Sequence, residues 1–132
     1  MDLGLRDKVA IVPGASKGIG KAIALELTQE GCQVVLCARG EEDLQAAIRE
    51  VEQVGYALSI AADVTKPNEV EKLVEETIAS FGKVDILVNN PRGIGRPASF
   101  EELSDEEWLE LLDLNVLSAV RLTRAVLPHM RE

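Results

Sequence analysis

A loop rich in glycine follows the first apolar run of the sequence, and its spacing suits the binding of a phosphate group. The loop, residues 13–20, reads PGASKGIG, a G-x-x-x-G-x-G pattern. Its first glycine permits a tight exit from a strand, its second lets a pyrophosphate approach the backbone, and its third lets a helix pack closely on a sheet. The open amides of that helix's first turn would face the phosphates. If the loop is more than a tight strand-to-helix turn, the predicted phosphate-binding residues are Gly14, Ser16, Lys17, Gly18, Ile19 and Gly20.

A basic residue stands where the second apolar run ends. Arg39 follows the run QVVLCA at residues 33–38, and the first carboxylate after it is Glu41. A carboxylate at the strand end would accept hydrogen bonds from a ribose 2′-hydroxyl and would repel a 2′-phosphate. Arg39 could instead clamp a 2′-phosphate, and Lys17 would add a second positive charge. The pattern favours NADP(H) over NAD(H), with a solvated surface cation as the alternative for each side chain.

Apolar runs and helical periodicities alternate along the chain, and they must position this loop. The predicted strands are residues 9–13, 33–38, 56–62 and 84–89, and the predicted helices are 18–30, 41–54, 67–81 and 104–131. Strands that are apolar throughout and separated by helices are typical of a parallel sheet covered on both faces. Right-handed crossovers then favour an α/β fold, a doubly wound Rossmann-type sheet with strand order 3-2-1-4. In the first helix, the spacing of Ile19, Ile23 and Leu27 predicts the face that packs on the sheet.

The composition fits one small domain over residues 1–132, and its charge disfavours some partners. Of the residues, 46% are hydrophobic and 28% are charged, and the net charge is −9. Such an acidic chain is a poor partner for nucleic acids and anionic membrane surfaces, because both are bound by neutralising phosphates. Residues 1–40 carry five basic and four acidic side chains, whereas residues 41–132 carry nine and nineteen. The near-neutral first part suits the reception of an anion.

The two cysteines indicate a reducing compartment. Cys32 and Cys37 are five residues apart beside one predicted strand, so we expect them to face opposite sides of the sheet and not to pair. Neither belongs to a metal-ligand spacing, and the sequence shows no signal peptide and no apolar run near the ~18 residues of a membrane span. We therefore expect a cytoplasmic protein without a metal site, whose thiols are small buried hydrophobic groups.

Polar residues after the third and fourth runs extend the pattern to a known family. Asp63 and Val64 follow the third run, Asn89 and Asn90 follow the fourth, and Asn115 lies in the last predicted helix. With the glycine loop, these residues resemble the short-chain dehydrogenase/reductase family over the whole chain, closest to members similar to the NADPH-dependent 3-oxoacyl-[acyl-carrier-protein] reductases. The resemblance implies that Asp63 and Val64 contact the adenine ring. It also implies that Asn89 and Asn90 begin the family's Asn-Asn-Ala-Gly motif beside the cofactor.

Two positions depart from the family's pattern. Pro13 stands where the family usually has Thr, which removes a hydroxyl and an amide donor at the strand end. After Asn90 the sequence continues Pro91-Arg92-Gly93 rather than Ala-Gly, which places bulk and charge where the family has a small residue. We expect Arg92 to point to solvent, with the binding of an anionic substrate or phosphate as the alternative. The loop of residues 91–103 could also contribute a wall to a substrate site.

Asn115 is the one catalytic-site residue that the resemblance implies for this chain. It stands seven residues after Trp108 and four after Leu111, so we expect it on the buried stripe of its helix. A buried amide without a hydrogen bond costs about 1–3 kcal/mol, so it needs a backbone or water partner. In the family this asparagine holds a water of the proton relay, and a structural helix kink is the alternative here.

The remaining catalytic groups of the family do not occur in the printed sequence. Family members move a hydride between nicotinamide and a carbonyl or alcohol, using Tyr, a Lys four residues later and an upstream Ser. A neighbouring ammonium must lower the phenol's pKa for such work near neutral pH. The one tyrosine here is Tyr56, and Ile60 stands four residues after it.

The expected protein is therefore a partial fold. The run at 84–89 is apolar and lacks the lysines that protect sheet edges, so we expect further strands and a C-terminal truncation. We expect the cofactor-binding half of an NADP(H)-dependent oxidoreductase that acts, when full-length, on a small carbonyl or alcohol. This chain alone would be inactive, and it would self-associate through its last helix or exposed sheet edge. A truncated, nonenzymatic dinucleotide-binding module is the alternative.

Overall fold

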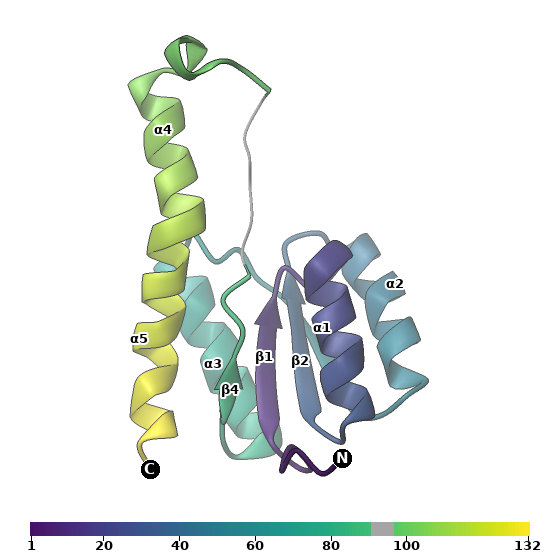
Figure 1. Ribbon diagram of the computed structural model, residues 1–132. Coiled ribbons are helices and arrows are strands. Elements are labelled where there is room, and N and C mark those ends of the chain that lie inside the picture. The colour runs from purple at the N-terminus through teal and green to yellow at the C-terminus, as the bar shows by residue number, and fades with distance from the viewer. Residues whose placement is uncertain (91–96) are drawn as a thin grey trace.

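The computed structural model describes residues 1–90 and 97–132, and strands and helices alternate along it (Figure 1). The strands are β1 (Val9–Pro13), β2 (Gln33–Ala38), β3 (Ala57–Ala61) and β4 (Ile86–Leu87). The α-helices are α1 (Gly18–Gln29), α2 (Glu41–Glu52), α3 (Pro67–Phe81), α4 (Asp105–Leu112) and α5 (Ser118–Met130). A 3₁₀ turn, η1 (Phe100–Glu102), precedes α4, and a π-helical turn, η2 (Asp113–Leu117), joins α4 to α5.

The four strands form one parallel sheet in the order β3-β2-β1-β4, which confirms the predicted order. Ile11 of β1 lies between Val35 of β2 and Leu87 of β4. Only Ile86–Leu87 of the predicted 84–89 run forms a strand, although the Val88 amide still donates to the Ile11 carbonyl at 3.0 Å. Within the described residues β4 pairs with β1 alone, over two residue pairs.

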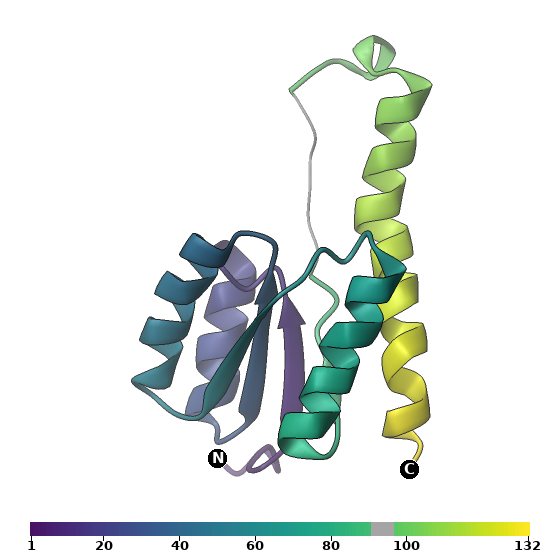
Figure 2. The same cartoon turned by 180° about the vertical axis from the view of Figure 1, so that it is seen from behind.

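Helices cover both faces of the sheet, and each face has its own apolar core. Alternate residues of β1 point to opposite faces. Ala10 and Val12 belong to the cluster under α1 and α2, whereas Ile11 belongs to the cluster under α3 and α5. Figures 1 and 2 show these pairs of helices from the two sides. Cys32 and Cys37 are buried in different clusters, which confirms that they face opposite sides of the sheet.

The buried face of α1 differs from the predicted one by a single position. Gly20, Ala24 and Thr28 are buried, whereas Ile19 is 65% exposed. The cause is the closeness of helix and glycine loop: a Cβ placed on Gly20 would lie 2.2 Å from the Gly14 carbonyl oxygen. Only small side chains fit this contact, so the larger apolar side chains turn away from it. The predicted face is therefore wrong at Ile19, whereas Leu27 is half-buried and packs against the core under α1 and α2.

The last helix is continuous from α4 through η2 to α5, and its first part extends beyond the carboxyl edge of the sheet (Figures 1 and 2). Its predicted start is confirmed by a capping box, in which the Glu107 amide donates to Ser104 Oγ at 3.2 Å. Ser118, Leu122 and Val126 of α5 are buried, but no residue of α4 or η2 is. None of the described helices is long and apolar enough to cross a bilayer.

Candidate cofactor-binding site

A cleft of about 240 Å³ lies where β1, β2 and β3 end. Its walls come from the turn after β1, the end of β2, the segment after β3, the first turn of α2 and one residue of η2. Its polar side chains are Ser16, Lys17, Arg39 and Asp43, and its apolar ones are Cys37, Ala38, Ala62, Val64 and Leu114. Ligands of doubly wound sheets bind at the carboxyl ends of the strands, so this is the expected place for a binding site.

The turn after β1 holds its backbone in a form that excludes larger side chains. Gly14 has φ +67°, and a Cβ there would lie 2.4 Å from the Asn90 carbonyl oxygen. The Ala15 amide donates to the Cys37 carbonyl at 3.1 Å, which ties the turn to β2. Both contacts hold the turn against the strand ends, and Gly14, Ser16 and Lys17 of this segment line the cleft.

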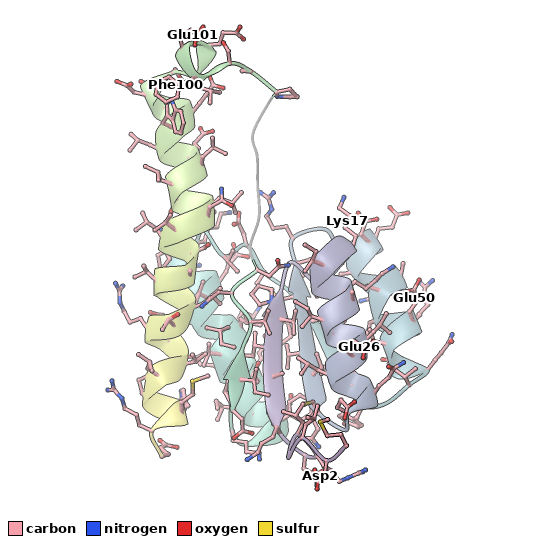
Figure 3. The ribbon with its side chains drawn as sticks, viewed as in Figure 1. Asp2, Lys17, Glu26, Glu50, Phe100 and Glu101 are labelled. Carbon is pink, nitrogen blue, oxygen red and sulfur yellow. The ribbon has the colours of Figure 1, made fainter. Side chains whose placement is uncertain are left out.

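The amino end of α1 lies beside this turn. The N-cap, Lys17, makes no side-chain capping bond, and the first turn contains no acidic residue. The first amides of a helix have no partner inside it and carry a partial positive charge. Figure 3 shows Lys17 at this end of α1, on the carboxyl edge of the sheet. The arrangement suits an anion such as a phosphate.

Two cations flank the cleft without being neutralised by a direct contact. Lys17 and Arg39 are exposed, and neither forms an ion pair within residues 1–90 and 97–132. Arg39 acts at longer range on Asp63. Burial raises the pKa of Asp63, but hydrogen bonds from Thr65 and the charges of Arg39 and Lys66 hold that pKa below its ordinary value.

Asp63 and Val64, which follow β3, have different surroundings. Val64 is buried and lines the cleft. Asp63 accepts hydrogen bonds from Thr65 Oγ1 at 2.7 Å and from the Thr65 amide at 3.0 Å, through its Oδ1. Asp63 is not among the residues that line the cleft, and its engaged Oδ1 fixes the turn that presents Val64. Its second carboxylate oxygen accepts no hydrogen bond from the described residues.

The two asparagines after β4 contact α5 and the glycine turn. Asn89 Nδ2 donates to Thr123 Oγ1 of α5 at 3.4 Å. Asn90 Nδ2 is buried and has no hydrogen-bond partner among the described residues. It lies against the glycine turn, 2.7 Å from the place a Gly20 Cβ would occupy. Neither asparagine lines the cleft. Arg92, for which solvent exposure was predicted, lies outside the described residues.

Asn115 is exposed, so its predicted burial is wrong. It lies in η2, and its Nδ2 donates to the Leu111 carbonyl at 2.9 Å. The extra residue of a π-helical turn rotates the helix face, so a seven-residue spacing from Trp108 no longer marks one stripe. Trp108 is itself 36% exposed, because α4 extends beyond the sheet that would cover it. The backbone partner is one of the two kinds expected for this amide.

Sequence reasoning missed five side chains of the cleft, those of Cys37, Ala38, Asp43, Ala62 and Leu114. Asp43 lies in the first turn of α2, Leu114 precedes Asn115 in η2, and Cys37 reaches the cleft from the core. Burial raises the pKa of the Cys37 thiol to about 12, so it contributes an apolar wall rather than a nucleophile. For Asp43 the available signal was its place in the first turn after a strand that ends at the predicted site. Leu114 is brought there by tertiary structure.

Comparison with known proteins connects this geometry to a family. A family model described as short chain dehydrogenase matches residues 8–132. The 3-oxoacyl-[acyl-carrier-protein] reductase FabG of Escherichia coli is 41% identical over 123 residues, which are 93% of this chain and 49% of that protein. The chain spans about half the length of the curated relatives it matches.

Two solved structures carry different cofactors on the same fold. L-Sorbose reductase from Gluconobacter frateurii, complexed with NADPH and L-sorbose, is 43% identical with a TM-score of 0.92, covering 99% of this chain and 50% of that one. NAD⁺-bound xylitol dehydrogenase is 32% identical with a TM-score of 0.91, covering 96% and 49%. The strand order, the glycine turn and the match over residues 8–132 agree: this chain belongs to the short-chain dehydrogenase family.

Proposed function

We propose that this chain binds a nicotinamide dinucleotide in the cleft at the ends of β1, β2 and β3. The protein then acts as an oxidoreductase on a small carbonyl or alcohol. The observation that carries the proposal is the glycine turn, where a Cβ on Gly14 or Gly20 would meet neighbouring atoms at 2.4 Å or less while the cleft side stays open. The relatives are named as reductases and dehydrogenases, which favours an enzyme over a nonenzymatic binding module.

The cleft residues fit the parts of such a cofactor. The backbone of residues 14–20, with Ser16 and the open amides of α1, would hold the pyrophosphate. Val64 and Leu114 offer apolar surface for the adenine, and Asp63 stands beside them with one carboxylate oxygen free of described donors. The residues that we propose to support the cofactor from the β4 side are Asn89 and Asn90. When bound, the nicotinamide supplies or accepts a hydride.

The catalytic role proposed within this chain is confined to Asn115. Asn115 is exposed in η2, and its Nδ2 donates a hydrogen bond to the Leu111 carbonyl. In the whole protein it would orient a water or a neighbouring group of the proton relay. The printed sequence contains no Tyr-x-x-x-Lys pair, so the group that exchanges a proton with the substrate is not among these 132 residues.

The preference proposed for the cofactor is NADP(H) over NAD(H). Lys17 and Arg39 both line the cleft, and no described carboxylate pairs with either. A 2′-phosphate would gain two charge-assisted contacts there that a 2′-hydroxyl cannot make. Relatives of similar fold are found with NADPH and with NAD⁺, so the choice depends on the side chains of this cleft.

The test is calorimetric titration of the chain with NADPH and with NADH. We expect the chain to bind both, with NADPH the tighter. Arg39→Gln should weaken NADPH binding by about tenfold, the worth of one charge-assisted phosphate contact, and leave NADH within about twofold. Arg49→Gln is the matched control, because Arg49 is an exposed cation of α2 outside the cleft. Absence of binding to either dinucleotide would refute the function, and equal affinities would refute the preference.

Self-association of the protein is proposed for the outer face of the last helix. Apolar side chains at 36–64% exposure follow this face, at Trp108, Leu109, Leu112, Val116, Leu117, Val120 and Leu127. An exposed apolar surface of this kind is typical of a protein–protein contact. Sedimentation of the chain should show a dimer or larger species, and a persistent monomer would contradict the proposal.

A further inference from the structure

One carboxylate shares the cleft with the two cations. Asp43 lies in the first turn of α2, four residues after Arg39, and lines the same cleft as Arg39 and Lys17. The same turn contains Glu41 and Glu42, which do not line it. Successive helical residues are about 100° apart around the axis, so the turn presents its three acidic side chains in three directions. Asp43 therefore places a carboxylate in the cleft, although the end of β2 carries none.

Asp43 is not neutralised by the cations beside it. Within residues 1–90 and 97–132, neither a hydrogen bond nor an ion pair within 4.0 Å joins Asp43 to any partner. The amino end of α2 favours an anion at this position. The cleft therefore presents two positive charges and one negative charge to whatever binds there.

The two forms of the cofactor would meet this carboxylate differently. A 2′-phosphate carries negative charge and is repelled by Asp43 while Lys17 and Arg39 attract it. A 2′-hydroxyl is not repelled, and it could donate a hydrogen bond to a carboxylate oxygen. Discrimination is a difference between two affinities, so one side chain can reduce a preference without abolishing binding.

We propose that Asp43 is a specificity-determining residue, which holds the preference for NADP(H) below what Lys17 and Arg39 would give and keeps NAD(H) usable in the same cleft. This inference rests on the proposed function, because it assumes that the cleft holds the adenosine end of a nicotinamide dinucleotide. It assigns to Asp43 an effect opposite in sign to that of Arg39.

The experiment titrates the wild-type chain, Asp43→Asn and Glu42→Gln with NADPH and NADH at low and high salt. Asp43→Asn should tighten NADPH binding about threefold to tenfold, the range for removing one like charge facing a phosphate across partly solvated space. NADH binding should stay the same or weaken, and the gain for NADPH should shrink at high salt. Glu42→Gln removes one carboxylate from the same helix turn outside the cleft, and should move either affinity by less than about twofold.

The outcomes separate the inference from the function on which it rests. If the wild-type chain binds dinucleotide but Asp43→Asn and Glu42→Gln change the NADPH-to-NADH ratio equally, the inference is overturned and the function stands. A weaker NADPH affinity in Asp43→Asn would also overturn it, since it would assign a supporting role to the carboxylate. If the wild-type chain binds neither dinucleotide, the function fails and the inference fails with it. Circular dichroism of each variant checks that the fold is retained.

Discussion

The glycine turn makes a quantitative prediction for the substitution Gly14→Ala. Gly14 has φ +67°, and an alanine in left-handed backbone costs about 1–2 kcal/mol. Its Cβ would also lie 2.4 Å from the Asn90 carbonyl oxygen, so backbone must move. Forcing an extra carbon into a packed site costs about 1–3 kcal/mol. The two terms together predict a loss of about 2–5 kcal/mol in the free energy of unfolding.

The chain contains a control that separates the two terms. Gly82, the C-cap of α3, has φ +80°, and a Cβ there would meet nothing within 4 Å. Gly82→Ala should therefore lose only the conformational part, about 1–2 kcal/mol. Urea denaturation followed by circular dichroism measures both variants against wild type. If Gly14→Ala loses no more than Gly82→Ala, the close approach of Asn90 to the turn is not the constraint described above.

Three further outcomes are expected. Burial acts to raise the pKa values of Asp63 and Asp85, but their hydrogen bonds and nearby lysines hold both pKa values below the ordinary 3.8. Each carboxylate therefore stabilises the fold above about pH 4, and this stabilisation is lost as the pH falls. Asp85→Asn, which removes the titratable charge that accepts from the Val9 amide and pairs with Lys83, should flatten the acid limb of the unfolding free energy, and an unchanged limb would contradict this. Cys37, with a pKa of about 12, should resist thiol reagents at pH 8 until the chain unfolds. Rapid labelling of Cys37 in the native chain would contradict its burial. The purified 132-residue chain should not reduce carbonyls, because it contains no Tyr-x-x-x-Lys pair, and turnover that survives purification would refute this.

The strands could be predicted from the sequence because their signals are local. Apolar runs bounded by loop residues placed β1 and β2 at their observed bounds, and the order β3-β2-β1-β4 followed from crossover handedness. The buried face of α1 was missed by one residue, because the contact between Gly20 and Gly14 is a property of the packed loop and not of helical spacing. The same cause limits any prediction made from periodicity alone.

The candidate site, like the fold, was predicted in part. Gly14, Ser16, Lys17, Arg39 and Val64 follow strand ends directly and were predicted, and the structure brings them to one cleft. Asp43 and Leu114 reach that cleft through a helix turn and through η2, so no local motif marked them. Asn115 was predicted to be buried because a regular helix was assumed. The π-helical turn and the extension of α4 beyond the sheet leave it exposed.

The central claim is that the cleft at the ends of β1, β2 and β3 holds a nicotinamide dinucleotide. The most direct measurement is an amide NMR spectrum of the isotope-labelled chain during titration with NADPH. We expect the largest shifts at the amides of residues 14–20, Arg39 and Val64, with the outer face of α3 unaffected. Shifts absent from the glycine turn, or centred on another surface while NADPH saturates, would contradict the claim.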